Sequence, residues 1–252
     1  MRRETQNVLL ILLGGALVKI ALNGDYLRYV KPAQQPWIIA GGAVMLLLGV
    51  AAIVRDIATV RAAAKAAHES EVDTAHSAAD GHGHHHPARS AWLLVVPVLA
   101  VFLVAPPALG ADSVTRTEAR LPASAATTSA AAFPPLPAGA VVPMAMNEVV
   151  TRAGWDANGT MNGRTVEISG FVVHTGGQTL LARLVISCCA ADAAPVTVHL
   201  KGGDADRFPS DTWLRVTGQI VPGTATEANS YTPDLVPATV ERITAPKDPY
   251  EY

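Results

Sequence analysis

Three long apolar segments constrain this chain more than any other feature. They lie at about 7–23, 37–54 and 91–109. A helix needs roughly 17 to 20 mainly apolar residues to cross the ~30 Å hydrocarbon core of a bilayer. Lys19 lies near the end of the first segment, where its side chain can reach the interface. No small-residue cleavage site follows that segment, so we expect an anchor that is retained. The chain is therefore predicted to be a multi-pass membrane protein with three N-terminal transmembrane helices.

The bulk composition agrees with this interpretation and narrows the partners. Of the 252 residues, 50% are hydrophobic and only 16% are charged, which is typical of a protein that contacts the lipid bilayer. The formal net charge is −2, whereas nucleic-acid binding needs a clustered basic surface. No nucleic-acid partner is expected. The two cysteines are too few to hold a fold together by disulfides.

The basic residues predict an orientation. Arg2 and Arg3 precede the first segment, and only Arg28 and Lys31 lie between the first and second. The loop at 55–90 carries four basic residues, which are Arg55, Arg61, Lys65 and Arg89. Because cytoplasmic loops are enriched in Lys and Arg, the N-terminus and this loop are predicted to be cytoplasmic. Three crossings then place the C-terminal domain outside the cytoplasm.

The 55–90 loop is also rich in histidine. It holds six of the eight histidines, five of them in a short tract: His76, His82, His84, His85 and His86. Neutral imidazoles bind zinc, nickel and copper. A low-affinity metal tract and a polar loop without a metal are both compatible with this pattern. Gly81 and Gly83 leave the tract without fixed geometry, so we expect no catalytic metal here.

The remaining sequence predicts a tether and a small β domain. Residues 110–143 are rich in Ala, Ser, Thr and Pro, which indicates an extended extracytoplasmic linker. In the domain at 144–252, a short helix at 144–155 precedes five strands. Their ranges are 164–172, 180–189, 196–201, 213–220 and 235–243. Five short strands favour an OB-like five-stranded β-barrel over a β-sandwich. The predicted fold class is thus an α+β membrane protein.

Two details of the strands can be predicted more closely. Thr175-Gly176-Gly177-Gln178 has the composition of a hairpin turn. We expect Val172 to pair with Leu180 across it. Pro237 predicts a bulge or an edge position in the last strand.

The two cysteines are neighbours at the end of the second predicted strand. Alternation along a strand would point Cys188 inward and Cys189 outward, onto the face that carries Arg183, Thr197 and His199. Four interpretations remain open. Cys188 can be a small core residue, the pair can form a vicinal disulfide, or a thiol can exchange disulfides with a partner. The fourth is a site for zinc or another thiophilic ion, formed by Cys189 or both thiols with His199 and Asp192.

Two neighbouring polar residues have simpler interpretations. Asp192 lies in a turn, where an aspartate usually accepts hydrogen bonds from nearby backbone amides. A role as a metal ligand is the alternative. Arg183 is expected to be a solvated strand residue.

Three stretches resemble a known family: residues 24–32, 163–172 and 182–195, the last of which contains Cys188-Cys189-Ala190-Ala191-Asp192-Ala193. In these stretches the chain is similar to a bacterial family of permease subunits. The resemblance implies N-terminal transmembrane helices, a C-terminal β domain and a larger permease as the membrane partner. It implies no defined reaction.

No enzyme is expected, because the sequence shows neither a nucleophile with its base nor a phosphate-binding loop. The leading hypothesis is an accessory subunit of a membrane permease complex, whose extracytoplasmic β domain binds, senses or gates a ligand or metal. One alternative is a stand-alone membrane-anchored metal-homeostasis protein. Another is a tethered module that binds a cell-envelope ligand.

Overall fold

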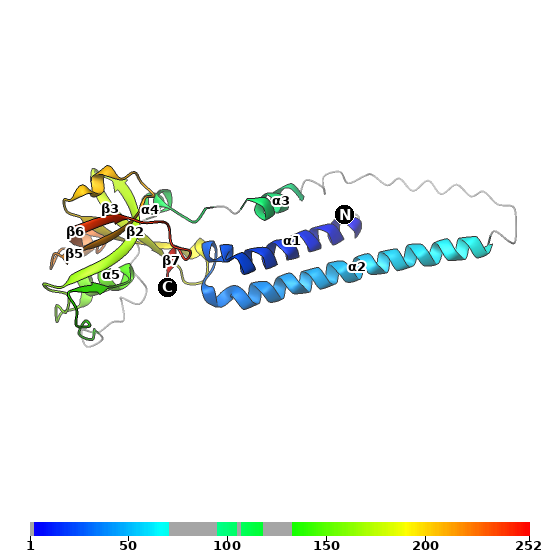
Figure 1. Ribbon diagram of the computed structural model, residues 1–252, viewed down its shortest axis with the longest axis horizontal. Coiled ribbons are helices and arrows are strands. Elements are labelled where there is room, and N and C mark those ends of the chain that lie inside the picture. The colour runs from blue at the N-terminus through cyan, green and yellow to red at the C-terminus, as the bar shows by residue number, and fades with distance from the viewer. Residues whose placement is uncertain (1–2, 71–94, 105–106, 118–132) are drawn as a thin grey trace. The chain divides into compact units, whose positions relative to one another are not determined.

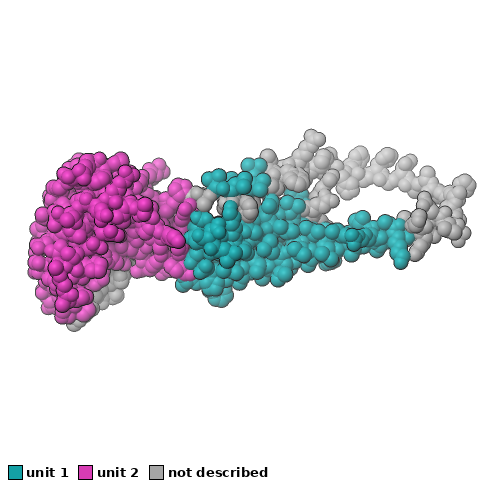
Figure 2. All heavy atoms as spheres, viewed as in Figure 1, with its two compact units in different colours: residues 1–26, 33–106 teal, residues 27–32, 107–252 magenta. Residues whose placement is uncertain are grey.

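The computed structural model describes residues 3–70, 95–104, 107–117 and 133–252. The chain divides into two compact units (Figure 2). The helical unit comprises Met1–Tyr26 and Ala33–Pro106, and the β unit comprises Leu27–Pro32 and Pro107–Tyr252. The histidine tract lies outside the described residues.

The helical unit contains α1 (Arg3–Asn23), α2 (Gln35–Ser70) and the short α3 (Val95–Leu103). α1 and α2 each contain a stretch that is long and apolar enough to cross a membrane. These stretches match the first two predicted segments. The third segment is described only in part, through α3, so a third crossing stays a prediction.

Glycines bring α1 and α2 into close contact. A Cβ atom on Gly14 would lie 2.8 Å from the Gly42 carbonyl oxygen, and one on Gly49 would lie 2.7 Å from Ile11 Cγ1. Larger residues would push the helices apart at these positions. Gly41, in contrast, has no atom within 4 Å of a Cβ built on it.

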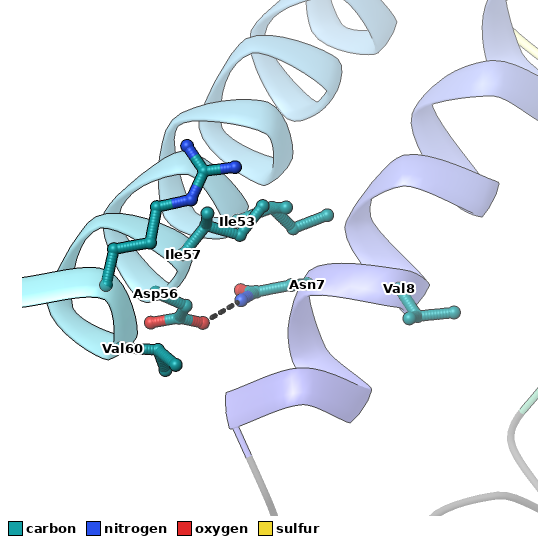
Figure 3. A pocket seen from close by; sticks show the side chains of 7 residues that line it. Asn7, Val8, Ile53, Asp56, Ile57 and Val60 are labelled. Atoms are coloured by element: carbon teal, nitrogen blue, oxygen red, sulfur yellow. Dashed lines mark hydrogen bonds between the residues drawn. The ribbon is translucent and has the colours of Figure 1, made fainter. Parts of the chain in front are cut away.

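A polar pair also joins the two helices, at the N-terminal end of α1. Asn7 Nδ2 donates to Asp56 Oδ2 at 2.9 Å (Figure 3). A cavity of about 420 Å³ opens beside the pair and is otherwise lined by Val8, Ile53, Ile57, Val60 and Arg61.

The β unit contains a seven-stranded sheet (Figure 1). Its strands are β1 (Val141–Pro143), β2 (Thr165–Thr175), β3 (Gln178–Val185), β4 (Ala194–Leu200), β5 (Trp213–Ile220), β6 (Asp234–Arg242) and β7 (Tyr250–Glu251). The strand order is β1-β2-β5-β6-β4-β3-β7, and β2 pairs with β3 in addition. All five predicted strands are present. β1 and β7 were not predicted, because two or three residues are too few to show a period.

The β2–β3 hairpin confirms the predicted turn and corrects its register. Gly176 and Gly177 take positive φ angles of 56° and 74° between the paired residues Thr175 and Gln178, as a type I′ turn requires. This two-residue turn pairs Val172 with Leu181. The predicted pairing of Val172 with Leu180 was wrong by one residue. The irregularity near Pro237 is confirmed, since the β5–β6 register shifts between Thr217 and Gly218.

Two apolar clusters stabilise the β unit. One lies between the sheet and α5 (Met146–Trp155), the predicted short helix, and includes Met146, Ile168 and Leu214. The other covers the opposite face of β2 and β3, where α4 (Ala111–Arg116) contributes Ala111 and Val114. The range expected to be an extended linker therefore contributes α4 and β1 to this unit.

Candidate functional site

The two cysteines lie in a loop beyond β3. β3 ends at Val185, and a 3-10 turn follows at Ala190–Asp192. The prediction that the strand continues to Cys189 was wrong. The Asp192 carboxylate accepts hydrogen bonds from the backbone amides of Ser187 at 2.7 Å and Cys188 at 2.8 Å. These amides therefore bond to a side chain instead of a neighbouring strand, which ends the ladder. We call residues 187–192 the thiol loop.

Both thiols are accessible and close together. Cys188 is exposed, Cys189 is partly buried, and neither forms a disulfide. Their Sγ atoms lie 3.7 Å apart, too far for a disulfide, whose S–S bond is about 2.05 Å. The placement of Cys188 in the core was wrong, because Cys188 is exposed in a loop that no longer alternates as a strand does.

The side chains of the thiol loop fit a metal ion. The Sγ atoms of Cys188 and Cys189 and a carboxylate oxygen of Asp192 all lie within 4.8 Å of one another. In a tetrahedral zinc site with Zn–S bonds of ~2.3 Å, two sulfurs lie about 3.8 Å apart. The observed separation of 3.7 Å meets this requirement without a change in the loop. Asp192 thus fulfils the backbone-capping prediction and also lies within ligand distance.

The neighbours of Cys188 in the thiol loop favour the protonated form of its thiol. A hydrogen bond to Asp192, with a smaller contribution from Cys189, raises the pKa of the Cys188 thiol to about 11. The same hydrogen bond is the main factor that lowers the pKa of Asp192. The Cys188 thiol is therefore protonated near neutral pH. A cation between these groups would take the place of that proton.

The backbone of the thiol loop is held by other segments of the β unit. The Ala190 amide donates to the Tyr29 carbonyl oxygen at 2.7 Å, and Cys189 forms an isolated bridge with Val30. The Tyr250 hydroxyl donates to the Arg28 carbonyl oxygen at 3.0 Å. Residues 27–32, expected only as a short connection, thus form one wall of the thiol loop.

His199 lies away from the thiols. The β3–β4 register pairs Val185 with Ala194 at the thiol-loop end and Leu180 with His199 at the other. Five residues separate these positions on β4, which is about 16 Å at ~3.3 Å per residue. His199 Nδ1 bonds to Asp234 Oδ1 at 2.9 Å instead. The structure brings Cys188, Cys189 and Asp192 together and does not add His199.

Arg183 corrects another expectation. Its side chain is only 9% exposed, so the prediction of a solvated arginine was wrong. The guanidinium lies 4.9 Å from the centroid of the Trp213 ring, and Nε lies 3.6 Å from Glu251 Oε1. Glu251 also accepts hydrogen bonds from the amides of Met146 and Asn147, at the start of α5. This partner lies on β7, a strand that was not predicted.

Fold and site together define an α+β chain that combines apolar N-terminal helices with a C-terminal β unit carrying two accessible thiols. Residues 5–119 match the DUF1980 N-terminal domain, and residues 155–252 match the DUF1980 C-terminal domain. The two stretches are thus similar to the two domains described for the DUF1980 family. The C-terminal match includes the whole thiol loop. No curated protein matches the chain.

Proposed function

We propose that this chain is a membrane-anchored accessory subunit of a permease complex, whose extracytoplasmic β unit binds a thiophilic metal ion at the thiol loop. The observation that carries the proposal is the separation of 3.7 Å between the two free Sγ atoms, with the Asp192 carboxylate within reach of both. The chain acts by binding and not by catalysis.

The membrane part of the proposal rests on α1 and α2. Each has the length and apolar composition of a spanning helix, and α2 exposes a series of large apolar side chains that suit lipid or a partner helix: Val44, Leu47, Leu48, Val50, Val54, Ile57 and Val60. The predicted third segment completes three crossings. The distribution of Lys and Arg supports an orientation with the β unit outside the cytoplasm.

The β unit itself is proposed to be an OB-like barrel. The pairings β2–β3, β3–β4, β4–β6, β6–β5 and β5–β2 return to the strand from which they started. The β4–β6 pair is parallel and the other four are antiparallel. A closed five-stranded Greek-key barrel of this kind is the OB architecture.

The ligand types favour a soft or borderline ion. Two thiolates and a carboxylate suit Zn²⁺, which takes Zn–S bonds of about 2.3 Å and leaves a fourth position for water or a partner group. Cu(I) would use the thiolates and leave Asp192 aside. In either case, binding releases the Cys188 proton.

A permease partner is supported by the surface of the helical unit. Gly41 has free space beside it, and an apolar surface next to a small residue suits a second helix. A stand-alone metal-homeostasis protein is the competing function. Purification from native membranes in mild detergent separates the two: we expect a larger membrane protein to co-purify in constant ratio. A lone chain that retains full metal content would favour the alternative.

The metal site is tested with full-length protein in which the five histidines of the tract are replaced by alanine. After equilibrium dialysis against Zn²⁺, elemental analysis is expected to give one bound ion per chain, and Cys189→Ser to remove it. Asp192→Asn is expected to weaken zinc binding. Asp204→Asn is its control, because Asp204 is an exposed carboxylate paired with Arg207 at 3.1 Å. Unchanged zinc content in Cys189→Ser would refute the site.

A further inference from the structure

A second concave site lies in the β unit, along the face of β4 that points away from the apolar core. Its cavity has a volume of about 480 Å³, within the usual range of ~300–1,000 Å³ for ligand pockets. One wall comes from Gln178 and Leu180 of β3, and another from Pro195, Thr197, His199 and Lys201 of β4 and its end. These β4 residues alternate with Val196, Val198 and Leu200, which face the apolar core. We call this the β4 pocket.

Two loops and the C-terminal part of α4 complete the β4 pocket. Thr175 belongs to the β2–β3 turn, and Asn229, Ser230 and Thr232 belong to the connection between β5 and β6. In an OB-type barrel, these two loops and the face of the second and third strands form the surface that binds oligonucleotides or oligosaccharides. The pocket therefore lies where the proposed architecture places a ligand.

The charges of the β4 pocket select between those two classes. Lys201 Nζ lies 3.5 Å from Asp234 Oδ2. The only lysine that lines the pocket is therefore paired with the only carboxylate that lines it. The lining contains no Phe, Tyr or Trp side chain. Single-stranded nucleic acids need a basic groove and aromatic stacking surfaces. The pocket instead offers neutral hydroxyl and amide groups: Thr115, Thr117, Thr175, Gln178, Thr197, Asn229, Ser230 and Thr232.

The polar groups are fixed in position before a ligand arrives. Asp234 holds His199 through Nδ1 at 2.9 Å, which leaves Nε2 for a ligand, and the Thr197 and Thr232 hydroxyls lie 2.8 Å apart. Ser230 and Tyr231 have positive φ angles of 55° and 56°. This backbone is held by the stacking of Tyr231 on Trp155, with ring centroids 4.5 Å apart. Such pre-organisation lowers the entropy lost on binding.

We propose that the β4 pocket binds a neutral oligosaccharide, of which one or two rings enter the cavity. Its hydroxyl, amide and imidazole groups match the mixed donors and acceptors of a sugar. Leu180, Pro195 and Val114 provide apolar surface for the C–H face of a ring. This function goes beyond the metal site and shares no residue with the thiol loop.

Saturation-transfer difference NMR on the full-length protein in detergent tests the proposal. The probes are N-acetylglucosamine tetramer, maltotetraose and cellotetraose, with an eight-residue oligothymidylate as the competing ligand class. We expect transfer to at least one saccharide and none to the oligonucleotide. Transfer to the oligonucleotide alone, or to none of the saccharides at 10 mM, would overturn the proposal.

Three variants locate the binding. Gln178→Ala removes an amide from the pocket, and Ser230→Gly removes a hydroxyl while keeping a residue that accepts the positive φ. Each is expected to weaken saccharide binding about fivefold, as the loss of one hydrogen bond does. Gln219→Ala is the matched control, because Gln219 is exposed on β5 and does not line the pocket. Equal weakening in all three variants would place the binding elsewhere and refute the site, whereas loss in the first two alone supports it. Cys189→Ser should leave saccharide binding unchanged.

Discussion

The thiol loop and the β4 pocket differ in almost every physical property that decides what a site can bind. The thiol loop is exposed, anionic and built on backbone amides that bond to Asp192. The β4 pocket is concave and neutral, and it is lined by side chains of β3, β4, α4 and the β5–β6 connection. Soft, anionic donors favour a cation, whereas balanced neutral donors and acceptors favour an uncharged polar ligand. The two proposed sites are therefore chemically different and share no residue.

The strands beside the thiol loop are joined to β7 by the buried ion pair between Arg183 and Glu251. Breaking this pair should give the largest change in stability. Arg183→Met leaves the Glu251 carboxylate with its two backbone-amide donors but without its cation, and removal of one member of a buried pair costs about 3 kcal/mol. The β unit is expected to unfold at a lower temperature, as followed by Trp213 fluorescence. Arg215→Met is the control, since Arg215 forms more exposed pairs with Glu167 and Glu241. Equal destabilisation by both variants would show that Arg183 has no special role.

The second prediction concerns the reactivity of Cys188. Asp192→Asn keeps an oxygen acceptor for the loop amides but replaces the carboxylate whose hydrogen bond with Cys188 raises the pKa of that thiol. If the pKa falls from about 11 toward its ordinary value of 9.0, the thiolate fraction at pH 8 rises about a hundredfold. The lower intrinsic nucleophilicity of the less basic thiolate divides that gain by a factor of about ten, so the labelling rate should rise about tenfold. Iodoacetamide labelling with mass spectrometry measures the rate. An unchanged rate would show that Asp192 does not control this proton.

The pH dependence of ligand binding should also differ between the thiol loop and the β4 pocket. Because Cys188 is protonated below its pKa of about 11, each bound ion displaces at least one proton, and zinc affinity should rise at least about tenfold per pH unit between pH 6 and 8. Competition with a chromogenic chelator measures it. A flat profile would exclude Cys188 as a ligand. Saccharide binding in the β4 pocket should not follow this profile.

The smallest effect is expected at the β4 pocket. Thr232→Val removes the hydroxyl that lies 2.8 Å from Thr197 and should lower the free energy of unfolding by about 1 kcal/mol. Chemical denaturation measures this change. Thr239→Val provides the matched control, since the Thr239 and Thr217 hydroxyls, 2.6 Å apart, form an exposed pair outside the pocket. Zinc content should be unchanged in both variants, and a loss of zinc in Thr232→Val would contradict the independence of the two sites.

The sequence allowed the regular parts of the β unit to be predicted, and the physical reason is periodicity. β5 and α5 were predicted closely because alternation or helical spacing continues over eight to ten residues. The Gly176-Gly177 turn was recognised because it needs positive φ angles. The register error at Val172 arose because facing residues were matched by hydrophobicity, whereas the turn fixes the pairing.

The candidate site was only partly predictable. Cys188, Cys189 and Asp192 were singled out together, yet the loop geometry depends on which backbone amides the Asp192 carboxylate accepts. His199 was grouped with the thiols because Cys189 and His199 were assigned to one sheet face, and a shared face does not imply proximity along a strand. The contacts of Tyr29 and Tyr250 join segments far apart in the chain, and no local pattern marks them.

X-ray absorption spectroscopy of the zinc-loaded full-length protein, with the tract histidines replaced, tests the central claim most directly. The account predicts two sulfur scatterers at about 2.3 Å and at least one oxygen at about 2.0–2.2 Å. Cys189→Ser should lose a sulfur scatterer. A zinc environment that contains only nitrogen and oxygen would contradict the thiol loop as the metal site.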